Sequence, residues 1–494
     1  MSRQPSTLER RYIARNTLNC YLNFNVTATY NKPVSKAQVS QALRTIMLTN
    51  DNLLLNAFRK DPGDTMEDDR RANGHNWVIK PVQKVKFDDV VSVEKIEQDT
   101  HQKESQIIAE YLSRLSSKTC ALNIDTPPWR LLIYETGQKT YLTFYFDHTF
   151  YDGYVGAQLH KDLIEQLDKQ DEPEYVDVLY DQEHDKMPNL YLTYYQQEQL
   201  YSPPWYYSIM NKIGQLKVVK WVSTLFEQIA YRFTSIGFLR KVFGLRFRLH
   251  PSALSRPIFS YKPTTMNFAT KFQIVNLSQA ELKEVLGFCK KHRLTFTPFL
   301  DVLALQTMEQ VIRPQVSPTP ISYFHFTATN GRRYFPYVKY VTAASAFPTM
   351  FGDVDGLTKE QTIDIIKSHG ERIVKLMKHM VPFRSQGMGM ESTNFWDFFL
   401  GCVGQIIKPT SVVTNIGNQK FECGQWKIEN MWFSQGNGAS FHFVFNVVSS
   451  HAGMNIVIGS LPEYEGLMEG KMMETFGRKL KENIMGIVRM ESRK

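Results

Sequence analysis

The segment FYFDHTFYDGYVG, residues 144–156, joins a strand pattern to a helix start through a histidine, an aspartate and a glycine. Side chains alternate up to His148, so the histidine shares one face of a predicted strand with apolar residues. Apolar residues then recur at helical spacing, which predicts a helix over Tyr154–Leu167. Asp152 occupies the N-cap position, and Gly153 allows a close approach of the backbone to its neighbours. The segment therefore predicts a strand–turn–helix unit with the histidine at the turn.

A histidine in this position suits a general base. Its pKa lies near neutrality in water, and a largely desolvated site keeps the imidazole neutral and able to accept a proton. The alternative is a core histidine bonded to a backbone carbonyl, with Asp152 acting only as a helix cap. For a histidine taken at random the second interpretation is the more frequent one, and the spacing alone leaves both open.

The length and composition predict a large mixed α/β protein. Its 494 residues are 43% hydrophobic, which allows a sizeable core divided over two or three lobes. Alternation over residues 20–30 predicts a strand, and helical spacing over 35–47 predicts a helix. We expect an N-terminal lobe over residues 1–180, a crossover over 181–260 and a C-terminal lobe over 261–494.

The C-terminal half shows further element starts. Lys271–Leu277 reads as a strand, and Ser278 with Glu281 forms a capping box that opens a helix. Thr297 and Pro298 predict another helix, with the threonine as cap and the proline at its first position. A final amphipathic helix is predicted from one apolar stripe, made of Leu467, Met472, Phe476, Leu480 and Ile484.

Several classes of site are absent from the sequence. It has no H-E-x-x-H, no phosphate-binding P-loop, no G-x-S-x-G and no dinucleotide-binding glycine fingerprint. The five cysteines are scattered, without zinc-ligand spacing, so we expect free, mostly buried thiols and no metal. His442 and His451 lie in strand-like segments and are interpreted as local hydrogen-bonding residues. The first residues, MSRQPSTLERR, do not resemble a secretory signal.

Much of the formal net charge of +9 comes from one basic, aromatic segment. Between Lys212 and Arg248 there are eight lysines and arginines and a single acidic residue, Glu227. Charges interrupt the apolar pattern too often for a membrane span, but a helix in the membrane interface combines such features. We expect residues 212–249 to contact a membrane or lipid-droplet surface; packing on the protein's own lobes is the alternative. No nucleic-acid recognition module is visible.

The hexapeptide HTFYDG, residues 148–153, resembles the H-x-x-x-D-G motif of the CoA-dependent acyltransferase superfamily, which includes plant BAHD acyltransferases and peptide-synthetase condensation domains. Further segments, in matching order over nearly the whole chain, resemble the yeast (fungal) alcohol acetyltransferase family. They are PPWRLLIY at 127–134, TFTPFLDVLAL at 295–305, TNGRRYFP at 329–336, VVTNIGN at 412–418 and the block at 433–460 that begins FSQGNG. Thr414 stands where this family tends to have serine, and Gly331 where alanine is common.

The resemblance implies an α/β (α+β) fold of two lobes with a central channel, similar to chloramphenicol acetyltransferase and condensation domains. It implies His148 as the general base and Gly153 as steric clearance. It also implies that Asp152 supports the loop by pairing with an arginine, either Arg332 or Arg333. The residues expected to line the substrate and CoA channel match the family's later motifs: Asn330, Arg332, Asn415, Gly417, Ser434 and Gln435.

The function implied by the resemblance is transfer of acetyl from acetyl-CoA to the hydroxyl of small or lipophilic alcohols, with no bound cofactor. N-acetylation of a long-chain amino alcohol, such as a sphingoid-like amine, is the alternative within the family. A non-catalytic relative that binds an acyl ligand or a membrane, and a hydrolase of acetyl-CoA, are alternatives from other classes. We expect a monomer, peripheral on the cytoplasmic side of the endoplasmic reticulum or on lipid droplets.

Overall fold

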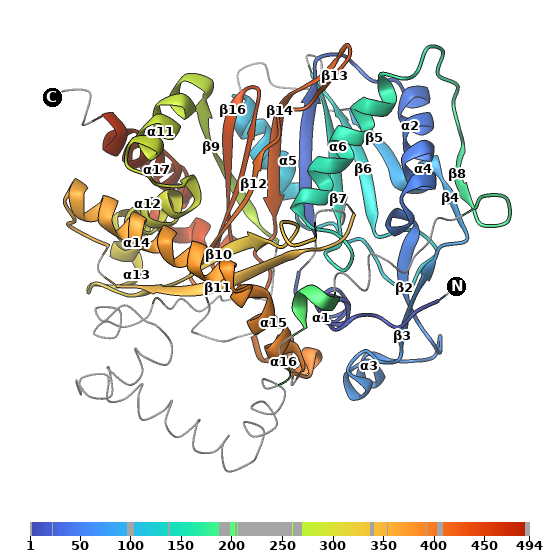
Figure 1. Cartoon of the computed structure of the whole chain (residues 1–494), viewed down its shortest axis with the longest axis horizontal. Helices are drawn as coiled ribbons and strands as arrows, with labels where there is room; N and C mark the ends of the chain where they lie inside the picture. Colours follow the sequence, from blue (N-terminus) through green and yellow to red (C-terminus); the bar gives the residue numbers. More distant parts are fainter. Residues whose placement is uncertain are drawn as a thin grey trace.

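Two six-stranded mixed sheets, each flanked by helices, carry the fold (Figure 1), which confirms the α/β prediction. The computed structural model describes residues 2–21, 23–95, 103–136, 139–186, 198–202, 205, 259, 269–335, 340–352, 354–391, 393–402 and 409–489.

The first sheet takes strands from both halves of the chain. In spatial order they are β13 (Glu422–Cys423), β14 (Trp426–Gln435), β1 (Phe24–Tyr30), β7 (Thr140–Phe146), β6 (Trp129–Glu135) and β5 (Val91–Lys95). All residues of β1 are buried, because it lies between β14 and β7 and is covered on both faces. The division at residues 180 and 260 stays a prediction, and β13 and β14 of the third predicted segment belong to this first sheet.

The second sheet comes from the C-terminal half. Its spatial order is β11 (Ala344–Phe351), β10 (Tyr323–Asn330), β12 (Ser411–Asn418), β15 (Phe443–Ser450), β16 (Gly453–Ser460) and β9 (Lys271–Ser278). Two small sheets pair β2 (Leu55–Arg59) with β3 (Trp77–Pro81) and β4 (Lys84–Lys86) with β8 (Val178–Asp181). β15 and β16 are buried along their whole length, which fits their apolar sequence.

The helices fall into three groups. Near the first sheet lie α2 (Lys36–Thr49), α4 (Phe87–Val90) and α6 (Gly153–Leu167), while α3 (Met66–Ala72) lies beside β3. Near the second lie α11 (Gln279–Lys291), α12 (Phe296–Val311), α13 (Arg313–Val316), α14 (Lys359–Lys378) and α17 (Met472–Arg489). α1 (Thr7–Thr17) packs beside α15 (Val381–Glu391) and α16 (Phe395–Cys402), while α5 (Glu104–Leu115) packs on β9. Two 3₁₀ segments complete the described elements, η1 (Asp51–Leu54) and η3 (Pro462–Gly470).

Most predicted helix starts are confirmed. Ser35 caps α2, Asp152 caps α6, and Ser278 caps α11 with Glu281 completing a capping box. In each case the side-chain oxygen accepts a backbone N–H that has no partner within the helix. These signals are local, so the sequence is sufficient to place them.

Two predicted positions are wrong. α12 begins at Phe296, with Thr295 at the N-cap, so Pro298 lies at the third helical position. A proline is tolerated there because the first-turn N–H groups have no partner within the helix. Leu467 lies in η3 and not on the final helix, whose buried stripe begins at Met472.

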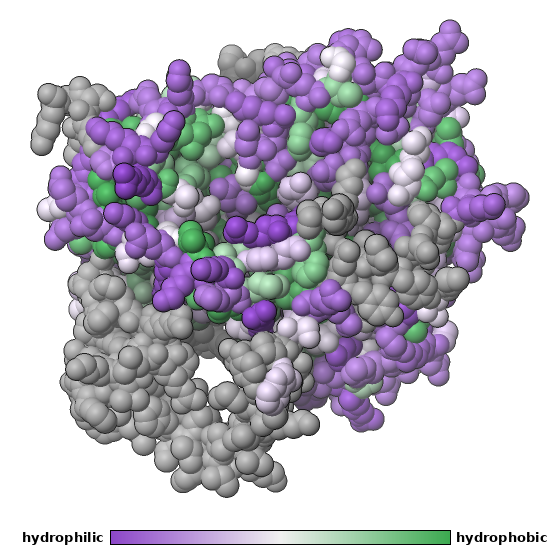
Figure 2. Space-filling view, in the orientation of Figure 1, coloured by the Kyte–Doolittle hydropathy of each residue, from purple (hydrophilic) through white to green (hydrophobic). Residues whose placement is uncertain are grey.

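The segment proposed for membrane contact, residues 212–249, lies outside the described residues. Figure 2 shows hydrophilic side chains over most of the described surface on one face, with apolar side chains visible between them. Among the described residues, no helix is both long enough and apolar enough to cross a membrane.

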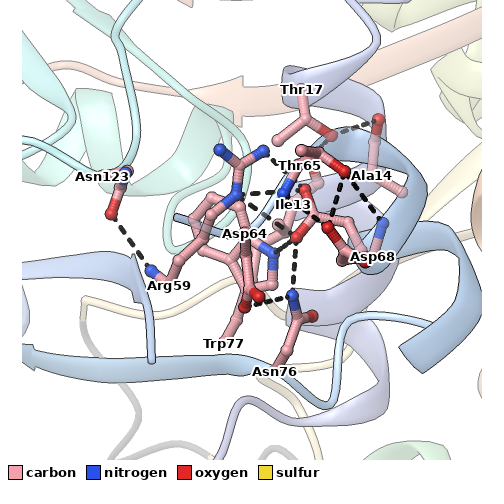
Figure 3. Close-up of polar contacts among 11 residues, drawn as sticks. Ile13, Ala14, Thr17, Arg59, Asp64, Thr65, Asp68, Asn76, Trp77 and Asn123 are labelled. Carbon is pink, nitrogen blue, oxygen red and sulfur yellow. Dashed lines mark hydrogen bonds and ion pairs between the residues drawn. The ribbon is translucent and has the colours of Figure 1, made fainter. Parts of the chain in front are cut away.

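A buried carboxylate holds α3 against the two-stranded sheet of β2 and β3. The Asp69 side chain is fully buried and accepts hydrogen bonds from Arg59 at 2.7 Å, Asn76 at 2.9 Å and the Trp77 indole at 2.7 Å. Figure 3 shows the side chains of Arg59, Asn76 and Trp77 converging on one place. Since a buried charge is stable only when it is paired and hydrogen-bonded, this carboxylate fixes the position of α3 relative to β2 and β3.

We expect Asp69→Ala to lower the free energy of unfolding by about 3 kcal/mol, because it leaves a guanidinium and two N–H donors without their acceptor. Chemical denaturation monitored by circular dichroism measures this change. Asp68→Ala is the matched control, since Asp68 only completes the capping box of the same helix; its expected cost is about 1 kcal/mol. Equal effects of the two substitutions would contradict the assignment.

Candidate active site

His148 lies in the turn between β7 and α6. β7 ends at Phe146, so the histidine is two residues beyond the strand on which the sequence placed it. Its ring stacks on Tyr12 with centroids 4.5 Å apart and planes 6° apart, and it lies 5.2 Å from the ring of Phe24. The imidazole is therefore held between aromatic side chains of α1 and β1.

The turn is anchored to α1 by hydrogen bonds. Asn16, near the end of α1, donates to the buried carboxylate of Asp147 at 2.8 Å. The backbone N–H of Thr149 donates to the same carboxylate at 2.8 Å. Because Asp147 directly precedes His148, these bonds fix the backbone that carries the imidazole.

The imidazole is neutral at physiological pH. Burial lowers the pKa of His148 to about 3, and the positive charge of Arg15 adds to the effect, while Asp152 opposes it. Nδ1 is buried and forms no hydrogen bond of good geometry. The backbone of His148 itself is close enough to raise the pKa of the ring slightly. Since the side chain borders a cavity, Nε2 is the nitrogen that a ligand can reach.

The cavity has a volume of about 350 Å³ and lies where the two sheets meet. Its wall combines α1 and the His148 turn with strands β10, β11 and β12 and with the connection from β14 to β15. Much of this wall is apolar, including Phe326, Val412, Phe433 and Val444. A site of this size between two lobes, with a few convergent polar groups, is typical of ligand binding.

Asp152 joins the two lobes next to the cavity. Its carboxylate forms two hydrogen bonds with Arg332, at 2.8 and 3.0 Å, and accepts the backbone N–H groups of Val155 and Ala343. Burial alone would raise the pKa of Asp152, but Arg332 and the hydrogen bonds outweigh it and hold the pKa below its usual value. Of the two arginines considered from the sequence, Arg332 is the partner, while Arg333 is exposed.

Gly153 is required sterically. A Cβ at this position would lie 2.6 Å from the ring of Phe433 and 3.0 Å from Ile416. Gly153 therefore lets the start of α6 approach β14 and β12.

The predicted channel residues differ in where they lie. Gln435 borders the cavity and donates to Thr414 at 2.9 Å. The other five positions do not line it. Arg332 pairs with Asp152, and Asn330 accepts the backbone N–H of Arg332. Asn415 donates to Thr297, and Gly417, two residues later, has a left-handed φ of 85°. Ser434 accepts from Asn25 between β14 and β1.

Sequence reasoning missed the contribution of α1. Arg11, Tyr12 and Arg15 of α1 line the cavity, as does Tyr21, which follows the helix. Arg11 and Arg15 are four residues apart, which places them on one face of a helix. That spacing is visible in the sequence, but only the tertiary structure shows that this face meets the His148 turn.

Among the described residues, one group has metal-ligand spacing: Asp181, Glu183 and His184. It lies on the surface after β8 and does not border the cavity. Asp181 already pairs with Lys84 at 2.8 Å, so the group is adequately explained as a charged turn.

We expect Arg332→Met to lower the free energy of unfolding by about 3 kcal/mol, because it leaves the buried Asp152 carboxylate without its cation. Arg333→Met, next in the chain and exposed, should change stability by less than about 0.5 kcal/mol. Denaturant titration of both variants tests this contrast. A near-neutral result for Arg332→Met would mean that the pair does not hold the lobes together.

Comparisons with known proteins agree with this geometry. The sequence profile of the family described as alcohol acetyltransferase matches residues 6–481. No curated protein sequence matches.

Solved structures with the same fold include the epimerization domain from the third module of tyrocidine synthetase B, with a TM-score of 0.57 and 14% identity over 100% of this chain and 99% of that chain. Trichothecene 15-O-acetyltransferase from Fusarium sporotrichioides has a TM-score of 0.57 and 12% identity over 97% and 95%. Wax ester synthase/diacylglycerol acyltransferase from Marinobacter aquaeolei VT8 has a TM-score of 0.55 and 9% identity over 98% and 100%.

At these identities the structural likeness concerns the fold, which is that of condensation domains and CoA-dependent acyltransferases. The profile match extends over nearly the whole sequence, including α1, the His148 turn and both sheets. The chain therefore belongs to the alcohol acetyltransferase family.

Proposed function

We propose that this protein transfers acetyl from acetyl-CoA to the hydroxyl of an alcohol, with His148 as the general base. The observation that carries the proposal is a neutral imidazole that borders a cavity of about 350 Å³ at the junction of the two sheets. Family membership supports an acyltransferase, and the position of the histidine supports its role in proton transfer.

In the proposed reaction, Nε2 of His148 accepts the proton of the acceptor hydroxyl while its oxygen attacks the thioester carbonyl carbon. The new C–O bond forms, and the C–S bond of the tetrahedral intermediate then breaks. The imidazolium returns its proton to the departing CoA thiolate. No covalent enzyme intermediate is required, because the thioester is already activated.

Thr414 is suited to stabilise the oxyanion of that intermediate. Its hydroxyl oxygen accepts from Gln435 at 2.9 Å, so its own hydrogen can be donated into the cavity that both residues line. A donor held in place before the reaction stabilises developing charge without reorganisation. Asp152 and Gly153 act as positioning residues, since their contacts are with the protein.

N-acetylation of a long-chain amino alcohol is the alternative within the family, and a neutral base serves both reactions. A hydrolase would need only water as acceptor, and a non-catalytic relative would release no CoA. Acceptor-dependent release of CoA thiol separates these cases. The peripheral location on the endoplasmic reticulum or lipid droplets stays a prediction, because residues 212–249 lie outside the described part of the chain.

We expect His148→Ala to lower acceptor-dependent CoA release at least about 100-fold, since general-base catalysis contributes that much or more. The assay uses the purified full chain with acetyl-CoA, with and without isoamyl alcohol, a sterol and a sphingoid base. His184→Ala, a change at an exposed histidine away from the cavity, is the control and should keep full activity. Release that is indifferent to His148 would return the histidine to a structural role.

The pH dependence of kcat/KM tests the protonation state. The base is active when unprotonated, and its pKa of about 3 keeps it unprotonated at every pH well above that value. We therefore expect no loss of kcat/KM from His148 as the pH falls from about 8 to about 5. An acidic limb with a pKa near 6.5 would show that the free-enzyme imidazole is solvated, contrary to the structure.

A further inference from the structure

The cavity beside His148 carries positive charge that no carboxylate of the described residues neutralises. Three of the described residues in its wall are ionised: Arg11, Arg15 and Asp152. Asp152 is already paired with Arg332, which lies outside the wall. No carboxylate of the described residues forms an ion pair with Arg11 or Arg15. Within the described part of the chain, the charges of the two guanidinium groups are therefore not balanced by a carboxylate.

Both arginines come from one face of α1 and lie close to the reacting position. The Arg15 guanidinium carbon is 3.9 Å from the centroid of the Tyr21 ring and 5.1 Å from that of Tyr12, the ring that stacks on His148. Its charge acts directly on the imidazole. Each guanidinium is planar and can form two parallel hydrogen bonds with a carboxylate.

An unpaired guanidinium in a desolvated wall is unfavourable for the free protein. Burial lowers the pKa of Arg11, and the charge of Arg15 lowers it further. Both arginine side chains are half-buried. A partly desolvated guanidinium is stabilised by a nearby negative charge, which a ligand in the cavity can supply.

We propose that Arg11 and Arg15 form a carboxylate-binding subsite next to His148, so that the preferred substrate carries a negative charge near its reacting group. This inference rests on the proposed acyl transfer and names the substrate class for it. The carboxylate has two sources. It belongs either to the acceptor, as in a hydroxy acid, or to the acyl group, as in a thioester of a dicarboxylic acid.

Binding of the carboxylate has a consequence for the base. A neutralised Arg15 no longer opposes a positive charge on His148, so the imidazole becomes a stronger base when the correct substrate is bound. A simple long-chain amine has the opposite property, because its ammonium group meets two arginines. The subsite therefore favours acids over plain amines.

The phosphates of CoA are another source of negative charge. The pantetheine arm separates them from the thioester, which reacts at His148, so they are poorly placed to reach this subsite. The affinity for free CoA, measured by calorimetry in wild type and in the arginine variants, distinguishes this case.

The test compares matched substrates in the purified full chain. For the acceptor arm, acetyl-CoA is used with 6-hydroxyhexanoate or its methyl ester, which differ only in the charge. For the donor arm, isoamyl alcohol is used with succinyl-CoA or butyryl-CoA. We expect a 10- to 100-fold preference in kcat/KM for the charged member in one arm, as charge-assisted hydrogen bonds provide.

Variants assign the preference to the two arginines. Arg15→Gln and Arg11→Gln should each reduce the charged-to-neutral ratio at least about fivefold, and Arg15→Lys should recover part of it. Arg10→Gln is the matched control, because Arg10 lies on the same helix but donates to the carbonyl of Asn73 outside the cavity. Its ratio should equal that of wild type.

The outcomes separate this inference from the proposed function. Transfer to neutral alcohols without any preference for a charged partner, or a preference that survives both glutamine substitutions, overturns the subsite and leaves the function intact. Loss of CoA affinity in Arg15→Gln with an unchanged ratio assigns the charge to CoA instead. If no acceptor supports transfer, the proposed function fails. In that case calorimetry still tests the subsite. The subsite is supported if wild type binds 6-hydroxyhexanoate but not its methyl ester, and if Arg15→Gln does not bind the acid. It is refuted if wild type binds the acid and the ester equally, or if wild type and Arg15→Gln bind the acid equally.

Discussion

The rest of the site depends on the carboxylate of Asp152. It caps α6, forms a bidentate ion pair with Arg332 beyond the end of β10, and accepts the N–H of Ala343 just before β11. One buried side chain thus connects the helix that follows His148 with two strands of the opposite sheet. Desolvating this charge is costly, and the ion pair with Arg332 and the N–H of Ala343 offset most of the cost, in addition to the N–H of Val155 in α6 itself. The relative position of the lobes, and with it the cavity between them, follows from that requirement.

Close packing defines the other side of the same region. β14 leaves the C-terminal half of the chain and pairs with β1, which brings Phe433 against the start of α6. Only a glycine at position 153 fits there. β14 then continues into the connection to β15, which forms part of the cavity wall. The ion pair of Asp152 with Arg332 and the pairing of β14 with β1 therefore act together. The ion pair sets the distance between the lobes, and β14 with its continuation supplies residues to the cavity wall.

Local signals were read correctly where a single element carries them. The cap at Ser278 depends on a side chain and an N–H three residues away, so the sequence contains the whole interaction. The helix at Pro298 was misplaced because proline is compatible with several positions in a first turn. The sequence placed His148 on a strand that ends two residues earlier, since alternation does not reveal where the ladder stops. The turn nevertheless leaves its ring beside Phe24.

By itself, the sequence determined the class of fold, the strand–turn–helix unit around His148, the glycine after Asp152 and the family to which they belong. It reduced the partner of Asp152 to two adjacent arginines and left that choice open. The tertiary structure decided it, because only long-range packing buries Arg332 and exposes Arg333. It also decided which residues share the cavity: Gln435 does, and Ser434, its neighbour on the other face of β14, does not. The positive charge that α1 brings to the cavity became visible only in the tertiary structure, since the sequence does not show which described carboxylates lie near Arg11 and Arg15.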